Sequence, residues 1–405
     1  MSELVFATPY TAGKILSGVL KALNDGQPKR PNWLQSFYPA PQTTELTTVN
    51  FDQQFATRNV MGLFALPNAD VEPVSLPNYG HKELAFSYAK EGFVSDDFEV
   101  LNQRQLGQQF GQVDVLANKA LRFNTKAAQV EQRFENLFEK VSAEILLYGG
   151  YGAVSEKYPL YVYDFGRTTA TIWSDIKGDN ALPLVPAANL TISAVTAPWN
   201  SSQTILPVIP TSGVDYTAGE KAWTKALVDA GTATPYLDVV KMIQTCNEWD
   251  RAVAIHMSQD AYDVFNYDVN KNYAPAAETT TLTLLNIQRD ILPRLDTVDG
   301  LHFQRTINVG GGVTLPIYSY KAIYHDRTTA ARTQYIGAGW VNVIPSGGYV
   351  KVHGRIMHPK AQWAAMPRWM NYWVNPKTGV EEWEWHTNFV QGSTNINAMV
   401  SWKVK

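Results

Sequence analysis

The sequence feature that most constrains the fold is an uninterrupted amphipathic run over residues 114–148. Apolar side chains recur along it at alternating spacings of four and three, which places them on one helical stripe: Leu116, Ala120, Phe123, Ala127, Val130, Phe134, Leu137 and Val141. No Pro or Gly interrupts the run, Glu144 ends the stripe, and Gly149-Gly150 follows as helix C-terminal glycines do. The pattern predicts one helix about 50 Å long, far longer than the helices of a compact core. Such a helix needs a sheet to lie on.

The end of the chain carries the strands that fit this helix. Within residues 380–387, Trp383 and Trp385 fall on one face of an alternating pattern, and Trp402 falls on one face of the last strand. We expect these aromatic faces to cover the apolar stripe. If residues near 120 pack against residues near 385 and 402, one domain is formed by two separate segments of the chain. The residues between these segments form another domain.

Two segments before the helix lack a core of their own. Residues 1–58 place Trp33, Leu34, Phe37 and Tyr38 on an arm punctuated by prolines, where they pack either on their own chain or on a neighbouring copy. Residues 59–105 read as a two-stranded excursion with a turn at Asn78-Tyr79-Gly80, followed by Leu84, Phe86 and Tyr88 on one strand face. A lone hairpin is marginal in water, so it should also find a partner surface.

The middle of the chain contains two segments that differ in composition and in predicted secondary structure. Residues 168–219 are rich in Thr, Ser, Ala and Pro and predict a small β insertion. Residues 220–340 read as mixed α/β, with helices near 237–249, 259–265 and 282–295 and strands near 252–257 and 315–324. The triple glycine at 310–312 has no lysine-bearing phosphate motif after it, which favours a hairpin turn.

Composition excludes several classes of protein. The chain has 405 residues, 34 Lys and Arg against 37 Asp and Glu, and a net charge of −3, so it lacks the electrostatic footprint of a nucleic-acid-binding protein. Cys246 is the single cysteine, which excludes an internal disulfide framework and fits a reducing compartment. The first residues lack the pattern of a signal peptide, and no apolar run approaches the length of a membrane span.

No catalytic, cofactor or metal site emerges from the motifs. Asp164-Phe165-Gly166 lacks the other motifs of a kinase, and His256 has no nucleophile signature near it. Glu382, Glu384 and His386 share a strand face and could bind a metal, but a solvated strand face is the more common outcome of such alternation. Exposed tryptophans that stack on sugar rings leave one alternative open, a β-rich carbohydrate-binding or tail structural protein of a phage.

The order of these parts resembles the major capsid proteins of tailed bacteriophages, with the Hong Kong 97 type of fold. The resemblance is closest to the capsid protein E family, which includes the lambda head protein. The residues that carry it extend over nearly the whole chain: 31–39 (PNWLQSFYP), 84–88 (LAFSY), 163–167 (YDFGR), Trp223, 235–238 (PYLD), Arg368-Trp369 and the closing strands. The segment 168–219 departs from that pattern.

The resemblance implies an α+β capsid fold. Its parts would be an N-arm (1–58), an E-loop (59–105), a P-domain (106–167 and 341–405), the β insertion and an A-domain (220–340). It also implies self-assembly into hexamers and pentamers of an icosahedral shell around double-stranded DNA, held without tight binding. A separate scaffolding protein, a portal and in some phages a decoration protein would be partners. The chain would be made in the host bacterial cytoplasm and end in the virion. Contacts between subunits are expected at Trp33, Leu34, Phe37, Tyr38, Tyr79 and Phe86.

Overall fold

The computed structural model describes residues 32–54, 79–95, 115–153, 161–165, 195–197, 200–205, 223–273, 300–310, 313–325, 332–374 and 380–404. The predicted long helix is present as α3 (Val115–Tyr148). It ends at Gly149, whose φ of 74° is left-handed and whose N–H donates to the Ile145 carbonyl. None of the helices in the described ranges is both long and apolar enough to cross a bilayer.

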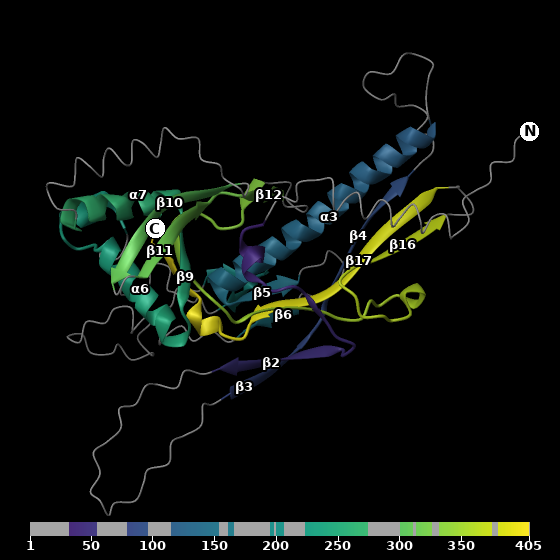
Figure 1. Cartoon of the computed structure of the whole chain (residues 1–405), viewed down its shortest axis with the longest axis horizontal. Helices are drawn as coiled ribbons and strands as arrows, with labels where there is room; N and C mark the ends of the chain where they lie inside the picture. Colours follow the sequence, from purple (N-terminus) through teal and green to yellow (C-terminus); the bar gives the residue numbers. More distant parts are fainter. Residues whose placement is uncertain are drawn as a thin grey trace, which may run out of the picture.

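A first sheet lies under α3. Its central strand is β17 (Glu381–Ser393), which pairs antiparallel with β4 (Ser87–Ser95) on one side. On the other side it pairs with β16 (Trp369–Val374) and with β15 (Tyr349–His353), and β15 pairs parallel with β1 (Gln42–Thr43). In Figure 1, α3 and β17 run side by side toward the same end of the molecule.

A second sheet has the strand order β10-β11-β9-β14-β18 and is covered by two helices. Its parts are β9 (Ala252–Met257), β10 (Leu301–Gly310), β11 (Val313–Tyr320), β14 (Trp340–Pro345), β18 (Val400–Lys403), α6 (Pro235–Trp249) and α7 (Gln259–Asp268). Strands β10 and β11 pair antiparallel as far as Gly310 and Val313, which confirms the hairpin predicted at the triple glycine. The helix predicted at 282–295 lies outside the described residues.

Shorter elements complete the description. Four two-stranded pairs are β2 (Thr48–Gln54) with β3 (Tyr79–Ala85), β5 (Gly150–Ala153) with β6 (Tyr161–Asp164), β7 (Val195–Ala197) with β8 (Asn200–Ile205), and β12 (Ile323–His325) with β13 (Arg332–Gln334). The short helices are η1 (Leu34–Phe37), α5 (Lys225–Asp229), η3 (Val269–Tyr273), η4 (Pro359–Ala361) and η5 (Ile396–Ala398). Of the predicted β insertion, only β7 and β8 fall within the described residues.

The last strand corrects the prediction that it lies under the long helix. Strand β18 pairs with β14 in the second sheet, and Trp402 packs edge-on to Trp223 in that sheet's core, 5.7 Å between ring centroids. The opposite face of β18 points toward α3, where Ser401 Oγ donates to the Leu146 carbonyl at 2.6 Å. Period-two alternation correctly indicates that one face is apolar, but it does not identify the element that covers that face.

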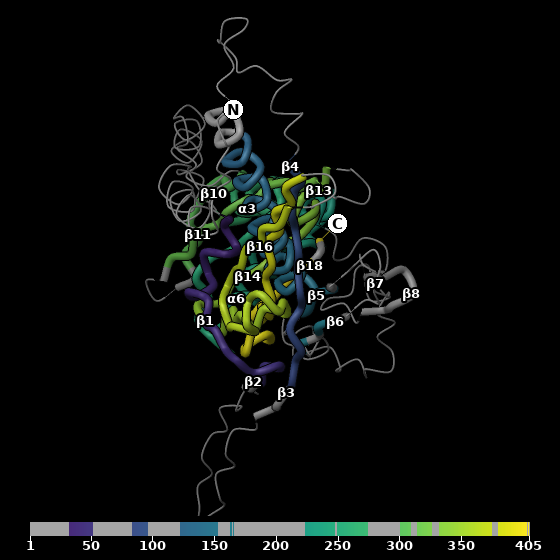
Figure 2. The backbone as a smooth tube through the Cα atoms, turned by 90° about the vertical axis from the view of Figure 1, so that its right-hand side faces the viewer, coloured from purple at the N-terminus to yellow at the C-terminus, as the bar shows by residue number. Residues whose placement is uncertain are grey.

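The hairpin before α3 also differs from the prediction. Tyr79 and Gly80, which were expected in a turn, belong to β3, which pairs antiparallel with β2. Phe86 alone separates β3 from β4, so the inward face changes there: Leu84 and Ser87 are buried while Tyr88 is exposed. In Figures 1 and 2 the β2–β3 hairpin lies at the bottom of the molecule, away from the second sheet.

The apolar stripe of α3 does not stop at Glu144. Every side chain from Val141 to Leu147 is buried, because the C-terminal turns of the helix lie between the first sheet, the second sheet and the β5 strand. Burial raises the pKa of Glu144 to about 7, an effect that Lys140 opposes at 3.7 Å. The two sheets therefore meet around the last turns of α3, and a chemically distinct site lies beside them.

Candidate functional site

The site is the place where the N-terminal arm docks on α3. The first backbone N–H groups of η1, from Leu34 and Gln35, donate to the two carboxylate oxygens of Glu139 at 2.9 and 3.0 Å. The unsatisfied N–H groups of a helical turn bind a carboxylate well, because their dipoles point at it. The Tyr320 hydroxyl donates to the same carboxylate at 2.7 Å. One fully buried glutamate thus connects the arm, the long helix and the second sheet.

Burial dominates the electrostatics of Glu139. Desolvation raises the pKa of its carboxyl group to about 7, and the donors from Leu34, Tyr320 and Gln35 act in the opposite direction. Desolvation also raises the pKa of the Tyr320 phenol, to which the negative charge of Glu139 adds. Glu139 therefore changes its charge close to neutral pH, where most buried carboxylates have one fixed state.

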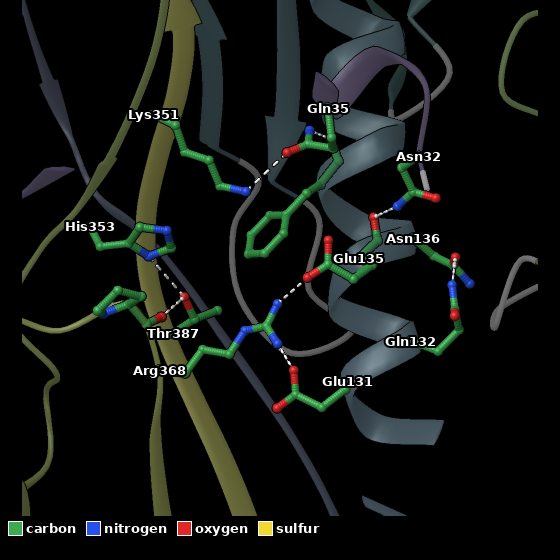
Figure 3. Close-up of polar contacts among 12 residues, drawn as sticks. Asn32, Gln35, Glu131, Gln132, Glu135, Asn136, Lys351, His353, Arg368 and Thr387 are labelled. Carbon is green, nitrogen blue, oxygen red and sulfur yellow. Dashed lines mark hydrogen bonds and ion pairs between the residues drawn. The ribbon is translucent and has the colours of Figure 1, made fainter. Parts of the chain in front are cut away.

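Gln35 extends the docking to the first sheet (Figure 3). Its amide nitrogen donates to the Phe138 carbonyl at 2.8 Å, and its amide oxygen accepts from Lys351 Nζ at 2.9 Å. The Lys351 ammonium also lies 3.8 Å from the centroid of the Phe138 ring, a cation–π contact. Burial lowers the pKa of Lys351 to about 8. Gln391, which is paired with Lys351 in the first sheet, donates to Ser142 Oγ at 2.5 Å.

Arg368 closes the site next to the arm. In Figure 3 its guanidinium lies between Glu131 and Glu135 of α3, to both of which it is ion-paired. It also lies over the Phe134 ring, 5.5 Å from the centroid, and Asn32 of the arm donates to the Glu135 carbonyl at 2.8 Å. The sequence pattern assigns no structural role to Arg368, although Arg368 is one of the residues that carry the resemblance to capsid proteins.

Sequence reasoning missed the glutamates of this site, although a signal was present. Glu131, Glu135 and Glu139 are spaced by four residues, so they form one row along α3 beside the apolar stripe. Along this row, Glu131 binds Arg368, the Glu135 carbonyl binds Asn32, and Glu139 binds the backbone of η1. In the sequence, an acidic row next to an apolar stripe looks like a solvent-exposed helix face. Only the residues that bind the glutamates in the fold show that this row belongs to a site.

Of the two arrangements expected for the arm, the structure shows Trp33 and Leu34 packed on their own chain. Trp33 and Leu34 are 6% and 4% exposed in their own chain, and Trp33 packs on Tyr318 and Tyr320. The stretch buries its own apolar surface because Glu139 supplies the carboxylate that its backbone needs.

The other expected contact residues also find partners within the chain where they are described. Phe37 and Tyr38 are half-buried against Tyr349, with centroids 5.9 and 5.0 Å away. Phe86 covers Gly354 so closely that a Cβ there would meet its ring at 2.9 Å. The side chain of Tyr79 lies outside the described part.

The residues expected to pack the helix on the sheet divide into two groups. Phe123 meets Trp383 with centroids 4.5 Å apart and also contacts Trp385, and all three lie toward the N-terminal half of α3. Farther along, Val130, Phe134 and Val141 are buried and Leu137 is half-buried. The side chain of Leu116 lies outside the described residues, and Trp402 packs elsewhere, as shown above.

The residues considered for chemistry are tied into structural contacts. Glu384 pairs with Lys90 at 2.6 Å and with His386 Nε2 at 3.3 Å, and His386 is buried beside the Tyr88 hydroxyl. His256 Nδ1 lies 2.9 Å from the Asn342 amide, and burial lowers the pKa of His256 to about 3, so it is neutral. The described ranges hold no group of three or more His, Cys, Asp or Glu that could bind a metal.

Comparison with known proteins identifies the fold. No family model matches the sequence, and no curated protein is similar to it. A crystal structure assigned to the capsid protein of an Escherichia coli CFT073 prophage superposes with a TM-score of 0.55 at 12% identity, over 96% of this chain and 98% of that chain. The chain therefore has the fold of a phage capsid protein.

Two other solved structures are more distant. The mature capsid of bacteriophage PhiM1 has a TM-score of 0.39 at 10% identity, over 88% of this chain and 82% of that chain. The capsid of Ralstonia phage GP4 has a TM-score of 0.38 at 8% identity, over 86% and 79%. These scores are too low to carry an argument by themselves.

Proposed function

We propose that this chain is the major capsid protein of a tailed bacteriophage, a structural protein and not an enzyme. Copies of it would form the hexamers and pentamers of an icosahedral shell that encloses double-stranded DNA. The observation that carries the proposal is the match to a prophage capsid protein over nearly the full length of both chains.

The surface supports the proposal independently. Large apolar side chains are exposed at several places of the first sheet and its loops, including Val94, Met357, Trp363, Trp373 and Val374. A monomer rarely leaves such side chains in groups, whereas a subunit of a lattice covers them with its neighbours. Each such contact is modest, but every subunit is held by several neighbours at once.

The Hong Kong 97 arrangement gives each part a role. Strand β3 would belong to the E-loop (59–105), and β2, which pairs with β3, would lead into it. Helix α3 and the first sheet would form the P-domain. The second sheet, with α6 and α7, would form the A-domain, to which β14 and β18 also belong. Scaffolding protein, portal and decoration protein would be separate chains.

The enclosed DNA would be confined by the shell and not bound tightly. Tight binding would require many Lys and Arg contacts to phosphates, with a steep salt dependence. The chain instead has 34 basic against 37 acidic residues. Titration of unassembled subunits with duplex DNA at physiological salt should give no binding below micromolar concentrations, and steeply salt-dependent sub-micromolar binding would contradict this.

Electron microscopy of the purified protein, expressed alone and together with its phage's scaffolding protein, tests the proposal. We expect closed shells of uniform diameter with hexameric and pentameric capsomers. Discrete monomers or trimers under all these conditions, together with binding on a glycan array, would favour the alternative of a carbohydrate-binding or tail structural protein.

A further inference from the structure

The loop between β15 and β16, residues 354–368, has an unusual backbone. Arg355 and Ala365 form an antiparallel bridge, and the Ile356 N–H donates to the Ala364 carbonyl at 3.1 Å. At the far end of the loop, Gln362 and Trp363 have φ values of 52° and 58°. They are the non-glycine residues with positive φ within the described part of the chain. Left-handed backbone is unfavourable for residues with a Cβ, and above all for a bulky one, so the loop holds a strained conformation.

The strain serves to present an apolar surface. Ile356 and Ala361 are buried and fix the inside of the loop, while Met357 and Trp363 are 56% and 53% exposed. Met357 follows Ile356 and Trp363 precedes Ala364, so both exposed side chains belong to the part of the loop beyond this hydrogen bond. An unfavourable backbone conformation thus keeps the Trp363 side chain exposed to water. This indicates that Trp363 contacts a partner outside the subunit.

A second exposed surface lies at the other end of β16. Trp373 of β16 is aligned with Glu382 of β17, and Glu382 is aligned with Val94 of β4, so these three side chains form one row across three strands. Trp373 and Val94 are 47% and 52% exposed, and Trp373 Nε1 donates to Glu382 Oε2 at 2.8 Å. We call these three residues the tip row. In Figure 1 the paired ends of β4, β16 and β17 that carry the tip row lie at the right, and the loop is the yellow-green curl below β16.

The two surfaces have complementary charge. Residues 354–368 include Arg355, Lys360 and Arg368 but no Asp or Glu. Arg355 pairs with Glu45, and Arg368 pairs with the α3 glutamates. Exposed Lys360 has only the Asn371 amide oxygen, at 3.5 Å, among the described residues. At the tip row the apolar side chains flank an acidic group, Glu382. The loop thus combines apolar side chains with a cation, and the tip row combines apolar side chains with an anion.

We propose that the loop of one subunit docks on the tip row of a second copy of this chain, with Trp363 and Met357 against Trp373 and Val94, and Lys360 against Glu382. This inference rests on the proposed function. The surfaces differ, so the contact is heterologous, and copies related by the same rotation close into a ring. The two surfaces lie beyond opposite ends of β16, a six-residue strand about 17 Å long. In such a ring each subunit contributes one loop and one tip row.

Charge exchange tests the pairing. Lys360→Glu and Glu382→Lys should each reduce the yield of shells at least tenfold, with subunits that stay soluble and folded by circular dichroism. The double variant should recover most of the yield. Gln362→Gly is the matched control, since it relieves the strain but keeps the Trp363 ring, and should assemble normally. Normal shells from both single variants would overturn the proposal, as would a double variant as defective as the single ones. Failure of the wild type to form shells would instead count against the proposed function.

Crosslinking provides a second test that does not depend on yield. The one native cysteine, Cys246, is buried, so engineered cysteines react alone. Shells of Lys360→Cys combined with Glu382→Cys, treated with a short bismaleimide, should give a ladder of oligomers on denaturing gels. Each single cysteine variant should give none. A crosslinked dimer from Lys360→Cys alone would show a symmetric loop-to-loop contact and would refute the proposed pairing.

Discussion

The two ends of β17 differ in how deeply their residues are buried. Its residues from Glu381 to Glu384 are all half-buried, whereas those from Trp385 to Ser393 are all buried. The same division runs along α3, where Phe123 packs in an aromatic group with Phe93 and Trp383, and where Glu139 and Ser142 are sealed under the arm. One end of the helix–sheet unit is closed by its own chain, and the other remains open.

The difference explains where each kind of interaction is used. The closed end buries carboxylate, amide and ammonium groups, which is favourable only when every partner is in place. The open end uses aromatic side chains, which tolerate partial exposure and can be covered later by a neighbour. Changes at the closed end should therefore act on folding, and changes at the open end on assembly.

Truncation of the arm should have the largest effect. Removal of residues 1–38 takes Trp33 and Leu34 out of the core and leaves Glu139 buried without the η1 N–H groups, a loss on the order of 5 kcal/mol or more. We expect an insoluble or unfolded chain. Removal of residues 1–31 keeps η1 and should give a folded subunit, as judged by cooperative thermal unfolding. Equal unfolding temperatures for the two truncations would show that η1 does not close this end.

Phe134→Ala should rank second. Phe134 is almost fully buried between α3 and the sheet, under Arg368, and truncation of a buried Phe costs about 3–5 kcal/mol. Gln129, exposed on the same helix, is the control, and Gln129→Ala should stay within about 0.5 kcal/mol of the wild type. Chemical denaturation of both variants measures the difference. Similar midpoints would mean that the apolar stripe does not face the sheet.

Protonation of Glu139 should have an effect of similar or smaller size. Its pKa is raised from 4.5 to about 7 in the folded state, so the folded state binds more protons than the unfolded state between these values. The contribution of this group is therefore full below pH 4.5 and is lost as pH rises through 7, by about 3 kcal/mol in total. Glu144 acts in the same direction, while His256 and His353, with pKa values lowered to about 3 and about 4, act in the opposite one below pH 6.5.

Glu139→Gln isolates this contribution. The variant should lose less stability than the wild type between pH 6 and pH 8 in urea titrations, because Gln does not titrate. The difference between the two pH slopes belongs to Glu139 alone, since Glu144 and the histidines are the same in both proteins. Identical slopes would show that the carboxyl group of Glu139 keeps one charge state over this range.

Phe123→Ala, at the open end, should have the smallest effect on stability. Phe123 is only partly buried, so its loss should cost about 1–2 kcal/mol, less than half the cost of the Phe134 change. Shell formation should suffer more than folding, which size-exclusion chromatography of the folded subunit and of the particles can separate. A stability loss as large as that of Phe134→Ala would remove the distinction between the two ends.

Much of the local structure could be predicted from the sequence. The long helix, its glycine stop, the helix at 235–249 and the strand at 252–257 all follow from short-range periodicity and turn residues. Partners across the chain could not be predicted in the same way. Trp402 and Trp385 have the same alternating pattern, yet they face different cores, because alternation specifies a face and not its neighbour.

The candidate site was hidden for a similar reason. Its essential donors are the backbone N–H groups of Leu34 and Gln35, which every residue except proline possesses. Glu139 becomes exceptional only because Tyr320 and η1 exclude water from it, and these are 181 and 105 residues away in the chain. The strain at Trp363 was equally invisible, since a tryptophan between Gln and Ala carries no signal of left-handed backbone.

The pairing of β4 with β17 has a consequence for the time at which a subunit becomes ready to assemble. Ser87 Oγ donates to the Phe389 carbonyl across 302 residues of sequence. At about 5–20 residues per second, a ribosome needs about 15–60 s to make the chain between these two strands. The tip row joins residues of β4, β16 and β17, so it exists only when synthesis is almost complete. A nascent chain therefore lacks the tip row, and under the proposed function the order of translation would keep incomplete subunits out of a growing lattice.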